Sequence, residues 1–297
     1  MKGLEYRWIA ALDEVIKQRG FENAAQTLCI SQSAVSQRIK QLEKRVAQPV
    51  LIRSHPLKAT PAGEKLLGLY RQVRLLEQEF WPELIDDAEQ KVTSVSIATN
   101  ADTLATWLVP SLQAVLIDQP IALNLIVVDE AKTLEKLRSG EVVAAISTEP
   151  KPIPGCNSES LGVMDYLCVA SPRFYKKYFS RGVNRQTLMQ APSVMFDQDD
   201  HLHEIFLKEH FNIAIRDTIT HTVRSSEAFV KLALHYIAYC LIPKVQITKE
   251  LEESQLINIT PDLRVSEEMY WHHWQLESGV LKALSKNVVE VANELLY

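Results

Sequence analysis

The chain has 297 residues, 46% of them hydrophobic, which is enough to bury a sizeable core in two or three domains. No apolar run approaches the roughly 20 residues that span a bilayer, and acids interrupt the N-terminus where a signal peptide is apolar, so we expect a cytoplasmic protein without membrane contacts. The formal net charge of −5 hides a basic segment: residues 1–60 hold 10 Lys and Arg against 5 Asp and Glu. This asymmetry is typical of a domain that contacts a polyanion, although a solvated helix surface can also be basic.

Residues 21–46 follow the pattern of two short helices joined by a tight turn. The first helix directs Ala24 and Ala25 inward, and these small side chains allow a close helix crossing. After a turn at Cys29–Ile30, Ser31 caps a second helix. The buried stripe of the second helix is spaced i, i+4, i+7 and i+11, at Val35, Ile39, Leu42 and Val46.

The opposite face of the second helix carries short hydrogen-bonding side chains and a cation, where an ordinary solvated face would carry Glu/Lys pairs. Such a face suits a helix whose N-terminal half enters the major groove of DNA. Together with the capping serine, the predicted DNA contacts on this helix are Ser31, Gln32, Ser33, Ser36, Gln37 and Lys40.

The next residues predict a wing, which is a two-stranded hairpin beside the helices. Strands are expected at residues 50–52 and 57–59, around a turn at His55–Pro56. Arg53 and Lys58 would then lie on the wing, where they can contact DNA phosphates.

The same residues fit a longer pattern, A-A-x-x-L-x-x-[ST]-Q-x-A-[VL]-S-x-x-I-x-x-L-E, followed by a wing and T-x-A-G. The matching positions are Ala24, Ala25, Leu28, Ser31, Gln32, Ala34, Val35, Ser36, Ile39, Leu42, Glu43, Thr60, Ala62 and Gly63. On this pattern, residues 6–64 resemble the DNA-binding domain of LysR-type transcriptional regulators. Many members of that family have Arg where this chain has Gln37, so the base contacted at this point can differ.

Residues 61–84 predict a long helix, with Thr60 as its cap and Pro61 at its first position. Its apolar residues are spaced 4, 3, 4, 3 and 4, at Ala62, Leu66, Leu69, Val73, Leu76 and Phe80. This alternation is typical of a two-helix seam and predicts a homodimer, whereas the alternative is packing onto the helix's own domain. Trp81–Pro82 and the acids at 86, 87 and 89 then predict a hinge.

From residue 92, short apolar runs alternate with helical patterns, which predicts an α/β domain. The first strands are expected at 94–99, 122–128, 142–147 and 166–170, with helices at 102–116 and 131–140. The later strands are expected at 193–197, 218–223, 240–243 and 269–274, with helices at 203–211 and 227–236 and a final helix ending at Leu296.

Two α/β halves joined by crossovers resemble a periplasmic-binding-protein-like effector domain, which has its ligand cleft between the halves. By that resemblance the first half comprises residues 92–161 and 268–297, and the second half comprises residues 162–267. The expected fold is therefore α/β: a winged helix-turn-helix domain (1–60), a linker helix with a hinge (61–90) and a two-half effector domain (91–297).

Three stretches, AVSQRIKQLE, NADTLATWLVP and SSEAFVKLA, resemble the branch of the LysR-type family that responds to arginine and lysine. The resemblance covers nearly the whole chain. It implies a transcriptional regulator of genes for basic amino-acid export or metabolism, in which closure of the cleft on lysine or arginine changes how dimers sit on DNA. Where the family often has a glycine-containing run, this chain has HYIAYCLIP, with Tyr236 in place of a small residue.

A basic amino acid needs anionic partners for its cationic end and hydrogen-bond donors for its carboxylate. The strand-to-helix junction SIATNADTLATW provides polar groups and a helix start, and acids lie at the ends of neighbouring predicted strands. The predicted effector contacts are Ser96, Asn100, Asp102, Thr103, Asp129, Glu130 and Asp197. For the acids the alternative is a local role, with Asp102 as a helix cap and Asp129–Glu130 as favourable residues at a helix start.

Enzyme, cofactor and metal sites have little support in the sequence. It contains no GxSxG, GxxxxGK[ST] or GxGxxG motif. Neither His201-x-His203 nor His272–His273 has the i, i+4 spacing of helical zinc ligands, and strand alternation would place one of the latter pair inward and the other outward. The cysteines have no CxxC spacing, and we interpret them as buried thiols: Cys29, Cys156, Cys168 and Cys240.

Two functions remain after these exclusions. The favoured one is an effector-controlled regulator that binds double-stranded DNA as a homodimer or homotetramer, with RNA polymerase as a further partner. The alternative is a sequence-indifferent nucleoid or replication-origin-binding protein. The acidic remainder of the chain argues against the alternative, because architectural DNA binders usually spread cations over much of their surface.

Overall fold

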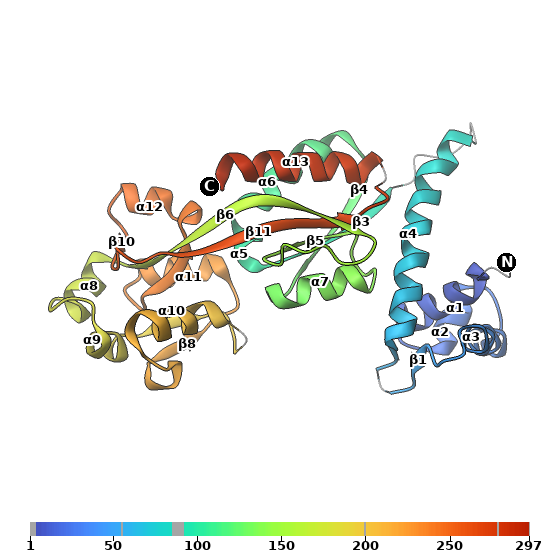
Figure 1. Cartoon of the computed structure of the whole chain (residues 1–297), viewed down its shortest axis with the longest axis horizontal. Coiled ribbons are helices and arrows are strands. Elements are labelled where there is room, and N and C mark those ends of the chain that lie inside the picture. Colours follow the sequence, from blue (N-terminus) through green and yellow to red (C-terminus); the bar gives the residue numbers. More distant parts are fainter. Residues whose placement is uncertain (1–3, 55, 85–91, 199, 278, 297) are drawn as a thin grey trace.

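A computed structural model of the chain describes residues 4–54, 56–84, 92–198, 200–277 and 279–296 (Figure 1). The N-terminal domain lies on the right of Figure 1, a long helix stands beside it, and the C-terminal domain extends to the left. Within these ranges, the structure contains no helix with the length and apolar character that a membrane crossing requires.

The N-terminal domain is a three-helix unit with a small hairpin. Its elements are α1 (Tyr6–Lys17), α2 (Phe21–Thr27), α3 (Gln32–Val46), β1 (Leu51–Ile52) and β2 (Lys58–Ala59). Ala24, Ala25, Val35, Ile39 and Leu42 are all buried in one core, as their spacing predicts. The turn between α2 and α3 is made by a residue with φ of +53°, Cys29, whose side chain is exposed. The expectation of a buried thiol is therefore wrong at this position, because the tight turn directs the residue to the surface.

The linker helix α4 (Pro61–Leu84) begins against the hairpin. The Thr60 hydroxyl accepts a hydrogen bond from the Gly63 N–H over 3.2 Å and caps the helix. A Cβ on Gly63 would lie 2.2 Å from the carbonyl oxygen of Val50, so only glycine fits this contact. The helix continues through Trp81–Pro82, so it has no break at these residues. The remainder of the predicted hinge, residues 85–91, lies outside the described residues.

The C-terminal domain is built on a seven-stranded sheet with the order β10-β6-β11-β5-β3-β4, in which β9 also pairs with β6. β7 and β8 form a separate parallel pair. The strands are β3 (Thr93–Thr99), β4 (Ile121–Val127), β5 (Ala144–Ser147), β6 (Cys156–Ala170), β7 (Ser193–Met195), β8 (Thr220–Thr222), β9 (Cys240–Pro243), β10 (Ile257–Asn258) and β11 (Val265–Trp274).

Helices cover both faces of this sheet, with α13 and α6 on one side and α7 on the other (Figure 1). The longer elements are α6 (Val109–Asp118), α7 (Glu130–Arg138), α10 (His201–Phe211), α11 (Ser226–Leu234) and α13 (Gly279–Leu295). The shorter elements are α5 (Ala101–Thr103), the π-helix η1 (Leu104–Leu108), α8 (Pro172–Tyr178), α9 (Arg185–Gln190), the 3₁₀ turns η2 (Ile215–Asp217) and η3 (Lys244–Gln246), and α12 (Thr248–Glu252).

Two long antiparallel strands, β6 and β11, run through both halves of the domain. The hydrophobic core of the first half includes Tyr166 on β6 and Met269 on β11. Cys168 on β6 belongs to the core of the second half, and Val265 on β11 packs against both cores. These two strands therefore connect the two halves of the domain.

Several elements differ from the sequence expectations. The single helix expected at 102–116 contains the π-helical turn η1, and the strand expected at 166–170 is only the end of the 15-residue β6. His272 and His273 are both buried, 0% and 2% exposed, although strand alternation predicts one outward side chain. The reason is that helices cover both faces of the sheet at β11. Cys168 and Cys240 are buried as predicted, whereas Cys156 is only half-buried.

Candidate functional site

The predicted DNA-contacting face of α3 is intact in the folded domain. Ser33, Gln32, Gln37 and Lys40 are exposed, Ser36 is partly exposed, and all five line one shallow concave surface. Ser31 lies at the start of the helix, where its hydroxyl accepts a hydrogen bond from the Ala34 N–H over 3.2 Å. The face therefore presents hydrogen-bonding groups outward while Val35, Ile39 and Leu42 hold the helix on the domain.

The hairpin carries two exposed cations, Arg53 and Lys58. Ile52 and Lys58 are paired across β1 and β2, and the Lys58 side chain is exposed. Arg53 follows β1 and lies with its guanidinium 5.9 Å from the centre of the Phe21 ring, which draws the wing toward α2. His55 of the predicted turn is outside the described residues.

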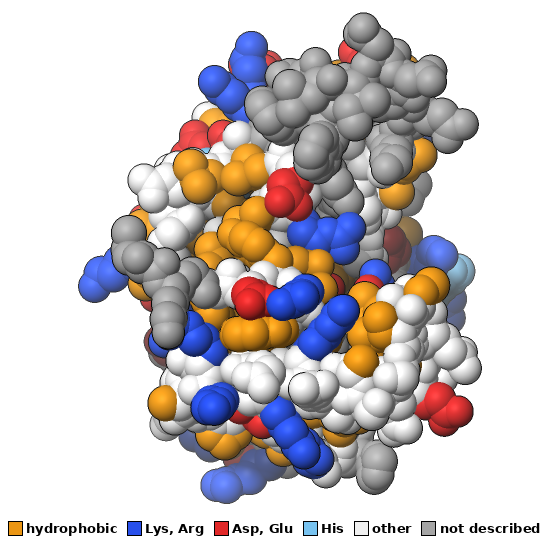
Figure 2. Space-filling view, turned by 90° about the vertical axis from the view of Figure 1, so that its right-hand side faces the viewer, with side chains coloured by type: hydrophobic (Ala, Val, Ile, Leu, Met, Phe, Trp, Pro, Cys, Tyr) orange, Lys and Arg blue, Asp and Glu red, His pale blue; other side chains and the backbone are white. Residues whose placement is uncertain are grey.

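The linker helix has two different faces. Leu67, Gly68 and Leu75 are buried against the rest of the chain, whereas Leu69 remains 46% exposed. The other described members of the predicted seam are only partly buried: Ala62, Leu66, Val73 and Leu76. Figure 2 shows the side of the molecule that carries the N-terminal domain, where several lysine and arginine side chains lie close to exposed apolar ones.

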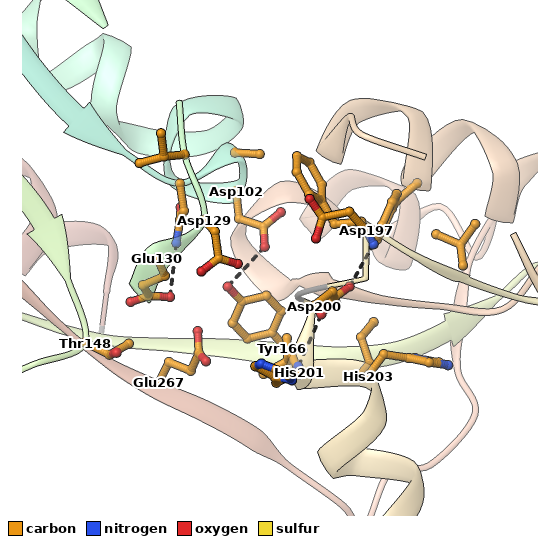
Figure 3. Close-up of a pocket in the computed structure, with 18 residues that line it drawn as sticks. Asp102, Asp129, Glu130, Thr148, Tyr166, Asp197, Asp200, His201, His203 and Glu267 are labelled. Atoms are coloured by element: carbon orange, nitrogen blue, oxygen red, sulfur yellow. Dashed lines mark hydrogen bonds between the residues drawn. The ribbon is translucent and has the colours of Figure 1, made fainter. Parts of the chain in front are cut away.

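A cavity of about 290 Å³ lies in the C-terminal domain where segments of both halves meet. Its size is near the lower end of the range for small-molecule pockets. No Lys or Arg is among the described residues that line it. Acids from both halves line the cavity together (Figure 3): Asp102, Asp129, Glu130, Asp197, Asp200 and Glu267.

Asp102 accepts hydrogen bonds from two side chains. Its Oδ2 accepts a hydrogen bond from the Tyr166 hydroxyl over 3.1 Å, and its Oδ1 accepts one from Ser226 over 2.5 Å. Burial raises the pKa of Asp102, and the two hydrogen bonds oppose this rise by favouring the ionised form. Because Ser226 begins α11 of the second half, Asp102 also connects the two halves.

Glu130 and Glu267 are two carboxyl groups with pKa values near neutrality. Burial is the main cause in both, and it raises the pKa of Glu130 to about 7 and that of Glu267 to about 8. The charge of Glu130 raises the pKa of Glu267 further, and the charge of Asp102 raises both. Burial therefore favours the protonated form of both groups, and a cation beside them would favour the ionised form.

The opposite wall is formed by the segment that enters α10. Asp200 caps α10 by accepting a hydrogen bond from the Leu202 N–H over 3.2 Å, and burial raises its pKa. Asp197 forms an ion pair with Arg224 over 3.3 Å. His203, 2% exposed, completes this wall, and burial lowers its pKa to about 4, so it adds no positive charge at neutral pH.

Five of the predicted effector residues meet in this cavity: Asn100, Asp102, Asp129, Glu130 and Asp197. Asn100, rather than Asp102, caps α5, accepting a hydrogen bond from the Thr103 N–H over 2.8 Å. Thr103 is fully buried and does not line the cavity. Ser96 lies elsewhere, in a second cleft of about 530 Å³ beside α4, which corrects the expectation for this residue.

Sequence reasoning missed six polar residues of the lining: Thr148, Tyr166, Asp200, His201, His203 and Glu267. Thr148 follows directly after β5. The acids are predicted because they lie at the ends of strands, and the same criterion could have identified Thr148. The lining residues of β6 and β11 gave no such signal, because they lie within long strands and their side-chain direction depends on the sheet. Among the described residues, no group of His, Cys, Asp and Glu side chains is placed to hold a metal ion.

Comparisons with known proteins identify both domains of the chain. The sequence pattern of the bacterial regulatory helix-turn-helix proteins of the lysR family matches residues 6–64. The pattern of the LysR substrate binding domain matches residues 88–292. The transcriptional regulator ArgP of Photobacterium profundum is 59% identical over 296 residues, which covers 100% of this chain and 99% of the relative.

Solved structures with the same architecture include two full-length regulators. The crystal structure of ArgP from Mycobacterium tuberculosis is 33% identical, covers 99% of both chains and has a TM-score of 0.89. LysG from Corynebacterium glutamicum with bound effector Arg is 31% identical, covers 99% of both chains and has a TM-score of 0.84. These matches extend over the DNA-binding domain and the effector domain together, and they are matches to regulators, not enzymes. The chain belongs to the LysR family of bacterial helix-turn-helix transcriptional regulators.

Proposed function

We propose that this regulator responds to a basic amino acid, arginine first and lysine second, and controls genes of basic amino-acid export or metabolism. The observation that carries the proposal is the charge of the cavity, where six acids face one space that no described Lys or Arg side chain lines. A neutral or anionic effector would leave the buried carboxyl groups of Asp102, Glu130 and Glu267 without a cation, whereas a cationic side chain compensates their charge.

The cavity has the chemistry that an amino-acid ligand requires at both ends. Glu130 and Glu267 accept hydrogen bonds from the cationic side chain, and the planar guanidinium of arginine offers five donors for such a set of carboxylates. The start of the helix at Asn100–Asp102 lines the cavity and offers the positive end of a helix to the ligand carboxylate. The LysG structure with bound arginine supports the choice of arginine as the first candidate.

The position of the cavity between two halves gives the control mechanism. A ligand that contacts acids from both halves favours closure about β6 and β11. In the homodimer that we propose, the apolar face of α4 pairs with its counterpart and two α3 helices enter successive major grooves of DNA. Dimers can then pair into tetramers and contact RNA polymerase.

In this proposal the polar side chains contact the bases of DNA and the cationic side chains contact its phosphates. Gln32, Ser33, Ser36 and Gln37 read base edges, while Ser31 positions the start of the helix. Lys40, Arg53 and Lys58 hold phosphates. A protein with this role works in the cytoplasm, where bacterial DNA is found. The alternative of a sequence-indifferent nucleoid or origin-binding protein is not favoured, because the similar proteins are regulators of transcription.

Calorimetric titration of the full chain with arginine and lysine tests the proposal. We expect Glu267→Gln to weaken arginine binding by about 10- to 100-fold, which corresponds to the loss of one charge-assisted hydrogen bond. Glu268→Gln is the matched control, since Glu268 is the next residue of β11 and is exposed outside the cavity. Equal losses in the two variants, or wild-type affinity in Glu267→Gln, would contradict the assignment of the cavity.

A further inference from the structure

The two ends of helix α7 lie at two different sites. Its first residue, Glu130, lines the effector cavity and accepts a hydrogen bond from the Asn100 side chain over 3.4 Å. Its last turn leads into Ser139 and Gly140, which lie against the linker helix α4. The nine residues of α7 form a rod about 13 Å long that packs on β5 and β3.

Just after the C-terminal end of α7, the chain approaches α4 closely through the backbone of two glycines, Gly140 and Gly68. Gly140 has φ of +68°, and a Cβ on this residue would lie 2.3 Å from the Cα of Gly68. A Cβ on Gly68 would lie 3.4 Å from the carbonyl oxygen of Arg138. Because no side chain separates the two helices here, a displacement of α7 cannot be absorbed by a change of rotamer.

One turn further along α4, Arg71 bonds to both neighbours of the linker helix. Its Nε and Nη2 donate hydrogen bonds to Oδ1 of Asp13 over 2.9 and 2.7 Å, and its Nη1 donates one to the Ser139 carbonyl oxygen over 3.4 Å. Asp13 is 8% exposed and belongs to α1, which packs on the DNA-contacting helix α3. A partly buried, multiply bonded ion pair holds its partners in one geometry.

We infer that α7 transmits effector binding to the DNA-binding domain through Gly68, Arg71, Ser139 and Gly140, a set that we call the α4–α7 joint. The inference rests on the proposed function, because it takes a cation bound by Glu130 as the signal. A cation that draws Glu130 into the cavity displaces the N-terminus of α7, and the stiff helix moves its other end against α4. The Arg71–Asp13 pair then carries the movement to α1 and α3.

The test is the effect of arginine on DNA binding by the full chain. An operator is selected from a random duplex pool, and operator affinity and the DNase footprint are measured with and without arginine. We expect arginine to change the operator affinity of the wild type by about fivefold or more, the usual range of allosteric coupling. In Gly140→Ala and Arg71→Gln we expect less than a twofold change in affinity and an unaltered footprint, with arginine affinity by calorimetry within threefold of the wild type.

Two matched controls separate this coupling from general damage. Gly155 also has a positive φ, +84°, but a Cβ there meets nothing within 4 Å, so Gly155→Ala imposes backbone strain without touching α4. Arg74 is exposed on the same helix and bonds to neither Asp13 nor Ser139, so Arg74→Gln removes a charge but not the bridge. Both controls should keep the arginine response.

Each outcome has a definite consequence. Arginine binding without any change in wild-type affinity or footprint would overturn the coupling through the joint, and so would an intact response in Gly140→Ala or Arg71→Gln. Both results leave the proposed effector standing. Absence of arginine binding in the wild type would instead refute the proposed function and remove the basis of this inference.

Discussion

The Tyr166 hydroxyl donates a hydrogen bond to Oδ2 of Asp102 over 3.1 Å. This bond joins β6, a strand shared by both halves of the effector domain, to the first helical turn after β3. Ser226 approaches the other carboxylate oxygen from α11, so three segments converge on one acid. Asp102 therefore connects the two halves at the edge of the cavity in which we propose that the effector binds.

Substitutions of Asp102 and of Tyr166 should weaken arginine binding to different extents. Asp102→Asn is expected to weaken arginine binding by about 10-fold or more, because it removes a charge from the cavity and a strong acceptor for Ser226 and Tyr166. Tyr166→Phe keeps the charge, so its loss should be smaller, about two- to fivefold. Calorimetry on both variants checks this order; a larger loss for Tyr166→Phe would contradict it.

Arginine affinity should increase as the pH rises from 6 to 8. Without a cation, the pKa values of Glu130 and Glu267 are about 7 and 8, so both groups are mainly protonated at pH 6. The ionised forms bind the cation, and binding at low pH must therefore release protons, which weakens affinity by about tenfold per unit for each proton released. Calorimetry in two buffers of different ionisation enthalpy measures the released protons. Proton uptake, or affinity independent of pH over this range, would contradict the prediction.

Substitutions at the proposed base contacts and at the proposed phosphate contacts should change DNA binding in different ways. Ser36→Trp is expected to abolish preference for the operator over random duplex, because the bulky ring would block the face of α3 that we propose reads base edges. Lys58→Ala is expected to weaken both DNAs alike and to lower the slope of log affinity against log salt by about one. Salt titrations on both duplexes check these results. Lys286→Ala, at an exposed position on α13, is the control that should change neither quantity.

Gly63→Ala should destabilise the DNA-binding domain. The added methyl would lie 2.2 Å from the Val50 carbonyl oxygen, which is backbone and can move only with the hairpin. We expect a loss of about 1–3 kcal/mol in the free energy of unfolding, as for other overpacking substitutions. Chemical denaturation monitored by circular dichroism tests this, with Gly20→Ala as the control, since its Cβ meets only one atom at 3.9 Å. Similar losses in the two variants would exclude the contact as the cause.

Local patterns in the sequence predict the structure of the DNA-binding domain well. The stripe of Val35, Ile39 and Leu42 follows helical periodicity, so it fixes which side of α3 is buried and which side is polar. The strand ends that carry Asn100 and Asp129–Glu130 are likewise predictable, because parallel strands bring their C-terminal ends to one edge of a sheet.

The parts of the site that the sequence does not predict depend on contacts between residues that are far apart in the chain. Tyr166 and Glu267 are distant in sequence and meet because β6 and β11 pair along most of their length, a register that no local pattern specifies. Tyr236 shows the same limit: it adopts φ of +64°, which favours glycine, and Arg173 lies 4.7 Å from the centre of its ring. The contact between Gly68 and Gly140 also depends on how two domains meet.

The central claim is that the cavity selects a basic amino acid by its charge. Arginine and citrulline have nearly the same shape, but citrulline carries a neutral ureido group in place of the guanidinium. Calorimetry on the full chain at pH 8 compares the two ligands directly. The six acids of the cavity predict that arginine binds at least about 100-fold more tightly than citrulline. Equal affinities, or tighter binding of citrulline, would contradict the account.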